Sequence, residues 1–107
     1  MNRGIIATSY ANIASPTNSE SAIETLKEAY SNEPFIYVSE NPPSSLSTLG
    51  SNMVHITARV DKRTETLISI VTLDNLVKGA SGMAIQNANI AMGIEETVGL
   101  PVVGLYP

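Results

Sequence analysis

The clearest pattern in the chain is an alternation of apolar and polar positions over residues 53–61. Alternate positions fall into two sets, Val54, Ile56, Ala58 and Val60 against Met53, His55, Thr57 and Arg59. A period of two predicts a strand with one packed face and one polar face. A charged link over residues 61–65 and an apolar run over residues 67–73 follow, and together they predict an antiparallel hairpin.

Two strands and a helix are predicted before the hairpin. Residues 5–13 are apolar, small or hydroxylic, which predicts a strand buried on both faces. Ser21 and Glu24 have the spacing of a capping box, and apolar positions three and four apart predict an amphipathic helix running to about Asn32. A proline then precedes a short predicted strand over residues 35–38.

The last predicted element is a helix over residues 75–92 with apolar or small residues almost all round it. Such a helix requires burial on more than one side. Gly93 is suited to cap its C-terminal end, and the Gly- and Pro-interrupted residues 95–107 predict an extended or irregular tail. The order of elements predicts a single α+β domain, in which helices cover one face of a mixed, largely antiparallel sheet.

Composition narrows the function classes. With 107 residues, 43% of them hydrophobic, the chain has room for one small domain. The net charge of -4 and the scattered basic residues argue against nucleic acid or an anionic membrane as a partner. No apolar run approaches the roughly 20 residues that span a bilayer, and the N-terminus lacks a signal-peptide pattern. We therefore expect a cytoplasmic protein.

Titratable and nucleophilic residues give little sign of catalysis. The sequence has no cysteine and one histidine, which excludes thiolate chemistry and a histidine metal cluster within the chain. His55 shares a predicted strand face with Arg59, but no nucleophile or carboxylate can be placed beside it, so a structural or surface role is favoured. Glu95 and Glu96 are adjacent and point apart, which favours solvated carboxylates over a catalytic pair.

The junction between the hairpin and the last helix carries the strongest site signal. Asp74 is suited to cap the first helical turn. The Asn75 amide can donate and accept, which suits a planar carboxamide such as nicotinamide, while the helix start and Lys78 favour anionic groups. Small residues over 79–84 leave one helix side nearly bare. These residues leave two interpretations open, a ligand site and a capped structural helix with a Gly/Ala packing face.

Ordered matches along the chain resemble a known family. The matching segments are MNRGI at 1–5, EPF at 33–35, PP at 42–43, GSN at 50–52, HI at 55–56, DNLVKGASGMAIQN at 74–87 and ETVGL at 96–100. With them the chain resembles the C-terminal part of N-acetyl-γ-glutamyl-phosphate reductase, in the semialdehyde dehydrogenase family. A looser helix motif occurs in aspartate-semialdehyde dehydrogenases. The resemblance implies the fold of the C-terminal domain of the glyceraldehyde-3-phosphate dehydrogenase-like family.

This resemblance implies an NADPH-dependent enzyme of arginine biosynthesis. The family reduces N-acetyl-γ-glutamyl phosphate to N-acetylglutamate 5-semialdehyde, using a cysteine that forms a thioester and an N-terminal Rossmann-type domain. The sequence has neither a cysteine nor a Gly-rich fingerprint. The expectation is therefore a C-terminal fragment, inactive alone, whose N-terminal dinucleotide-binding domain is absent. The alternative is a non-enzymatic binding or assembly module that retains the sheet and helix.

Residue roles follow from the matched motifs. The resemblance implies that Asn75 contacts the nicotinamide of NADP, that Lys78 and Gly79 add cofactor contacts, and that Arg3 contacts substrate. No catalytic residue and no metal ligand is implied, and His55 does not inherit the family's histidine role. The helix over residues 75–92 would pack on the missing domain. Because that surface lacks its partner and the family's sheet forms oligomer contacts, we expect a homo-oligomer or a mobile helix.

Two positions depart from the family pattern, and one motif has two interpretations. Glu65 occupies a turn position where the family usually has glycine, and Met83 replaces a common glutamine in the helix. The first change affects a surface turn, and the second is expected to loosen a domain contact. Ser51 and Asn52 either touch substrate or shape the entry to the next strand.

Overall fold

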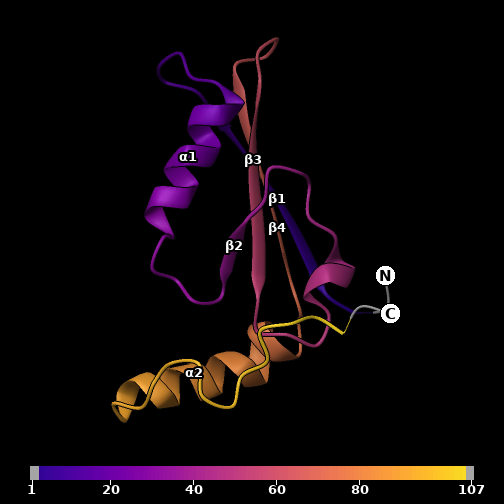
Figure 1. Ribbon diagram of the computed structural model, residues 1–107. Coiled ribbons are helices and arrows are strands. Elements are labelled where there is room, and N and C mark those ends of the chain that lie inside the picture. The colour runs from indigo at the N-terminus through magenta and orange to yellow at the C-terminus, as the bar shows by residue number, and fades with distance from the viewer. Residues whose placement is uncertain (1–2, 106–107) are drawn as a thin grey trace.

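A four-stranded sheet forms the centre of the computed structural model, which describes residues 3–105 (Figure 1). Its strands are β1 (Ile5–Asn12), β2 (Ile36–Val38), β3 (Val54–Asp61) and β4 (Thr66–Leu73), in the order β1-β4-β3-β2. β4 is antiparallel to both β1 and β3, whereas β2 is parallel to β3. This arrangement confirms the predicted hairpin and the mixed, largely antiparallel sheet.

The helix α1 (Ser19–Ala29) packs beside β2 and β3. It buries Ile23 near Ala58 of β3, as its apolar spacing predicts. Asn18 is the N-cap and accepts a hydrogen bond from the Ser21 amide at 2.8 Å. The helix therefore begins before Ser21 rather than after it, because Asn18 satisfies the donor that the predicted capping box would have used.

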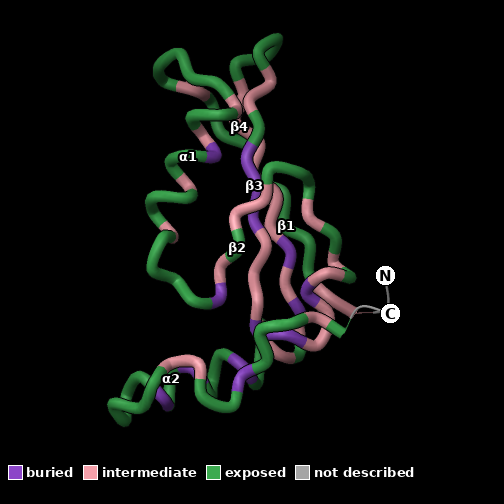
Figure 2. Tube along the Cα trace, viewed as in Figure 1, coloured by how far each residue is buried: buried purple, intermediate pink, exposed green. Residues whose placement is uncertain are grey.

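The strand β1 is exposed along its whole length, so the prediction of burial on both faces was wrong (Figure 2). Tyr10 is 69% exposed and Ile6 is 50% exposed. The reason is position. β1 is an edge strand that pairs with β4, and α1 packs against β3 and β2, toward the opposite edge of the sheet. Its apolar character therefore creates surface rather than core.

The last helix consists of two parts. A π-helical turn, η2 (Val77–Ser81), leads directly into α2 (Gly82–Ala91), and Gly93 follows with a φ of 68°. This confirms the helix and is consistent with the predicted glycine cap. However, α2 runs away from the end of the sheet instead of lying across it (Figure 1). The predicted cover of one sheet face is therefore made by α1, whereas α2 extends beyond the end of the sheet.

Most of the deeply buried side chains are polar. The largest almost fully buried side chains of residues 3–105 are one apolar residue, Phe35, and six polar ones, Asn52, Thr48, Thr57, Thr72, Asp74 and Ser51. Several of these lie where β4 ends and the loop containing the short 3-10 helix η1 (Ser45–Thr48) returns to β3. Buried polar groups need hydrogen-bond partners, so this end of the sheet is held by a specific network.

Candidate functional site

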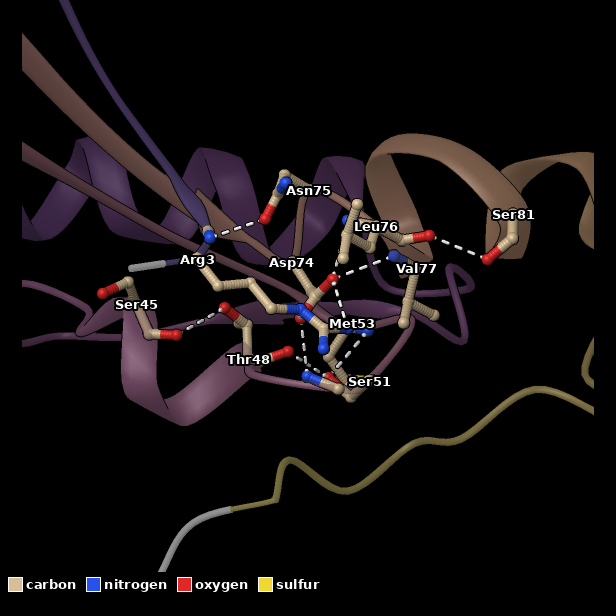
Figure 3. Close-up of polar contacts among 12 residues, drawn as sticks. Arg3, Ser45, Thr48, Ser51, Met53, Asp74, Asn75, Leu76, Val77 and Ser81 are labelled. Atoms are coloured by element: carbon tan, nitrogen blue, oxygen red, sulfur yellow. Dashed lines mark hydrogen bonds and ion pairs between the residues drawn. The ribbon is translucent and has the colours of Figure 1, made fainter. Parts of the chain in front are cut away.

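Asp74 lies at the centre of the polar end of the sheet, directly after β4 (Figure 3). Its side chain is 0% exposed. Oδ1 accepts from the Leu76 and Val77 amides, each at 2.8 Å, which confirms the predicted helix cap. Oδ2 accepts from the Gly50 amide at 2.7 Å. One carboxylate therefore joins the helix start to the loop before β3.

The environment of Asp74 keeps it ionised. Burial alone would raise the pKa of this carboxyl group. Hydrogen bonds from Gly50, from Arg3 and from the first helical turn outweigh that effect and lower the pKa to about 2. Asp74 is therefore ionised near neutral pH, as a structural anion that accepts hydrogen bonds.

Arg3 supplies the positive charge that faces Asp74. Its Nε lies 2.8 Å from Oδ2, and its Nη2 donates to Oδ1 at 3.1 Å. The Arg3 side chain remains 34% exposed, and Nη1 makes no hydrogen bond within residues 3–105. The guanidinium group is thus anchored on one side and open on the other.

Asn75 is oriented by the residue that follows Arg3. Its Oδ1 accepts from the Gly4 amide at 2.7 Å. Its Nδ2 makes no hydrogen bond to a described residue, and the side chain is half-buried. The amide therefore offers a donor of fixed direction, which suits the carbonyl oxygen of a carboxamide. A nicotinamide carboxamide fits this requirement.

Gly79 and Lys78, the other two predicted cofactor contacts, are engaged within the chain. The Gly79 amide donates to the Asp74 carbonyl at 2.9 Å, so glycine here offers close approach but no free donor. Lys78 Nζ donates to Gln86 Oε1 at 2.7 Å and lies 5.4 Å from the centre of the Phe35 ring. Burial lowers the pKa of Lys78, and nearby carboxylates oppose that shift.

A second polar cluster was not foreseen from the sequence. Gln86 Oε1 also accepts from Asn52 Nδ2 at 2.9 Å, and Gln86 Nε2 donates to Glu96. Asn52 is fully buried, and its Oδ1 has no hydrogen-bond partner among residues 3–105. A Cβ added to Gly82 would lie 2.3 Å from that oxygen. This cluster joins α2 to the start of β3 and to the tail.

One sequence signal could have revealed this cluster. Within α2 the buried residues are Gly82, Gln86 and Asn89, which recur at helical spacing. A stripe of polar residues on an otherwise apolar helix indicates that this stripe is buried against polar groups of the protein.

The Ser51 hydroxyl donates to the Thr48 carbonyl and accepts from the Met53 amide. This corresponds to the strand-entry role proposed for Ser51.

His55 and the glutamates do not assemble a catalytic group in the described residues. The His55 ring lies edge-on to Tyr37 with ring centres 5.1 Å apart, and burial lowers its pKa. Glu95 accepts from Thr97 whereas Glu96 accepts from Gln86, so the two carboxylates have separate partners.

Within residues 3–105 no group of three or more metal-binding side chains occurs. None of the described helices has the length and apolar character needed to traverse a bilayer.

A family model matches most of the chain. The model described as the semialdehyde dehydrogenase dimerisation domain matches residues 1–75. The chain belongs to the semialdehyde dehydrogenase dimerisation-domain family. Because the match ends at Asn75, it includes the Arg3, Asp74 and Asn75 cluster and ends just before η2.

Curated relatives of this semialdehyde dehydrogenase domain are named N-acetyl-gamma-glutamyl-phosphate reductase. The chain is 44% identical to the protein from Dehalococcoides mccartyi (strain BAV1) over 107 residues, which is 100% of this chain and 31% of that protein. It is 45% identical to the Thermoanaerobacter sp. (strain X514) protein over 109 residues, covering 100% and 32%. The chain therefore spans about a third of the length of its relatives.

Solved structures agree on the fold. Aspartate semialdehyde dehydrogenase II from Vibrio cholerae superposes with a TM-score of 0.65 and 19% sequence identity, over 85% of this chain and 28% of that chain. At this identity the similarity establishes the shared fold of the dimerisation domain. It therefore agrees with the predicted mixed, largely antiparallel sheet and shows the fold alone.

Proposed function

We propose that this chain is the C-terminal part of a cytoplasmic reductase of arginine biosynthesis. The complete enzyme would use NADPH to convert N-acetyl-γ-glutamyl phosphate to N-acetylglutamate 5-semialdehyde and phosphate. The observation that carries the proposal is the 44% identity over the whole chain to a relative with the reductase name. The chain contains no cysteine, so the nucleophile must come from the remaining part of the enzyme. Alone, this chain is expected to be inactive.

Asn75 is the proposed contact to the cofactor. NADPH would supply the hydride when it is bound. Asn75 contributes the Nδ2 donor toward the carboxamide oxygen, because the Gly4 amide already occupies Oδ1. Lys78 and Gly79 remain predicted contacts, and Gly79 can contribute only close approach.

Arg3 is the proposed substrate contact. An acyl phosphate carries negative charge, and the open Nη1 of Arg3 is a suitable partner for a phosphate or carboxylate oxygen. The Asp74 carboxylate neutralises part of the guanidinium charge, so Arg3 would act through directed hydrogen bonds more than through net charge.

The last helix is the proposed docking surface for the dinucleotide-binding domain. The exposed apolar side chains on α2 and just after it include Met83, Ile85, Ile90, Met92 and Ile94, with Met92 66% exposed. Exposed apolar area of this kind marks an interaction surface. The relatives are about three times as long as this chain, which supports a domain of the same polypeptide as the partner.

The sheet is the proposed contact between two copies of the enzyme. The matched family segment is described as a dimerisation domain and contains all four strands. The exposed apolar residues of β1, such as Ile6 and Tyr10, supply surface for such a contact.

A chimeric enzyme tests the proposal. The matched segment of the D. mccartyi relative is replaced by this chain, and NADPH oxidation is measured with N-acetyl-γ-glutamyl phosphate. We expect activity in the chimera and none in the 107-residue chain. Asn75→Ala should raise the KM for NADPH, whereas Asn87→Ala, on the exposed side of α2, should not. A folded chimera without activity would instead favour the non-enzymatic assembly module.

A further inference from the structure

We propose that Asp74 is a positioning residue that couples the substrate contact Arg3 to the cofactor contact Asn75. The inference rests on the proposed function, because it assigns those two residues their ligands. It goes further by identifying one buried carboxylate as the group that sets both of their orientations.

The coupling begins with two pairs of neighbours in the chain (Figure 3). Arg3 bonds Asp74 through its side chain, and Gly4 bonds the Asn75 side chain through its backbone amide. The two contacts join segments that lie 71 residues apart in sequence. Each pair therefore fixes the other: if Arg3 leaves Asp74, the Gly4 amide moves relative to Asn75.

A carboxylate is required at position 74 because both oxygens accept. Oδ1 receives Arg3 Nη2 and the two amides of the helix start, while Oδ2 receives the Gly50 amide and faces Arg3 Nε. In Asp74→Asn an oxygen can still cap the helix, but an NH2 group then faces the Gly50 amide and Arg3 Nε. This substitution separates helix capping from Arg3 positioning.

The groups left open by this cluster are the two that the proposed reaction needs. Within residues 3–105, Arg3 Nη1 and Asn75 Nδ2 make no hydrogen bond, whereas Arg3 Nη2 donates to Asp74, Arg3 Nε lies 2.8 Å from the same carboxylate, and Asn75 Oδ1 accepts from Gly4. The direction of both free donors is therefore set by contacts that converge on residues 74–75. Preorganised donors of this type bind ligands without paying for ordering at the moment of binding.

The first arm of the test measures positioning in the 107-residue chain. NMR exchange rates of the Arg3 Nη2 protons, which bond Asp74, and of the Gly4 amide are compared in the parent chain, Asp74→Asn and Asp61→Asn. Asp61 is a matched control, because it also accepts from a backbone amide and pairs with an arginine, in the turn after β3. We expect exchange at both Arg3 and Gly4 to accelerate about tenfold or more in Asp74→Asn alone. Unchanged exchange would overturn the proposal.

The second arm measures the coupling in the chimeric enzyme. Asp74→Asn should raise the KM for NADPH and the KM for the acyl phosphate, each by about tenfold. The effect on NADPH should disappear in an Asn75→Ala background, and the effect on the acyl phosphate should disappear in an Arg3→Ala background. Independent, multiplicative effects would refute the coupling.

A second variant, Arg3→Lys, tests the coupling if Asp74→Asn does not fold. If Asp74→Asn does not fold, Arg3→Lys replaces the two-point contact by a single ammonium and is compared with Arg63→Lys, whose partner is the exposed Asp61. Arg3→Lys should then accelerate Gly4 exchange while Arg63→Lys leaves it unchanged. An inactive parent chimera would contradict the proposed function, whereas the NMR arm would still decide whether Asp74 positions Arg3.

Discussion

Gly82 provides the sharpest test of how the last helix is seated. Its backbone is helical, with φ -65° and ψ -40°, so alanine suits the conformation. The obstacle is space: a Cβ would lie 2.3 Å from Asn52 Oδ1 and 2.8 Å from the Val77 carbonyl oxygen. These distances are about 1 Å inside ordinary contact. Either α2 must move or the buried Asn52 must turn away from Gln86.

The expected cost of Gly82→Ala follows from these contacts. Overpacking costs about 1–3 kcal/mol, and loss of the bond between Asn52 and Gln86 adds about 1 kcal/mol. The better helix propensity of alanine returns up to about 1 kcal/mol. The net destabilisation is therefore about 2 kcal/mol, which lowers the Tm by about 8–16 °C in a domain of this size.

Gly79→Ala is the matched control on the same helix. A Cβ there would meet its nearest atoms, the Asp74 carbonyl oxygen and Leu73 Cδ1, at 3.4 Å, which is ordinary contact. We expect no loss, or a gain of up to about 1 kcal/mol from helix propensity. Urea unfolding and thermal melts of both variants give the comparison. If the two substitutions change the free energy of unfolding by the same amount, α2 does not press on Asn52 as described.

Three further predictions concern charge, the tail and a turn. Because the folded pKa of Asp74 is lowered to about 2, its stabilisation is complete above the unfolded value of 3.8 and is lost as pH falls toward 2, by about 2 kcal/mol in urea unfolding measured at each pH; an Asp74→Asn variant with the same loss of unfolding free energy between pH 4 and 2 would contradict this. Gln86→Met should accelerate hydrogen exchange over residues 94–101, since Glu96 loses its partner, whereas Asn87→Met on the exposed side should not. Glu65 has a φ of 50°, so Glu65→Gly should raise the free energy of unfolding by about 1 kcal/mol in urea titrations, and an unchanged value would show that this turn is unstrained.

Local sequence patterns predicted the elements that depend on neighbouring residues. The strand at β3, the capping role of Asp74 and the glycine that follows α2 were each readable from residues a few positions apart, although Thr57, on the predicted polar face of β3, is fully buried. The unusual turn at Glu65 was also signalled, because the resemblance places glycine there and the structure has a positive φ. Such features are encoded within a single stretch of chain.

Features that depend on distant contacts were not predicted. The run of apolar residues in β1 indicates a strand, but only the strand order shows that it lies at an edge. Arg3 meets Asp74 across 71 positions, and no local pattern specifies that pairing. The Gln86 cluster likewise combines residues from the loop before β3, from α2 and from the tail. Gln86 appeared in a matched motif without a stated role, while Asn52 and Glu96 were interpreted separately and not as partners of Gln86.

The orientation of α2 also discriminates between possible partners for its apolar side. Met83, Ile85, Ile90 and Met92 are each 42–66% exposed. Burying the exposed half of four such side chains would contribute on the order of 4 kcal/mol. Association of two free molecules costs about 4–15 kcal/mol in lost translational and rotational freedom. The apolar side of α2 alone is therefore too small to hold a second copy of the chain. A domain connected through the same polypeptide avoids most of that cost, since the connection supplies a high effective concentration. The modest apolar area of α2 therefore favours a covalently linked domain as its partner, and leaves the larger sheet surface for contact between copies.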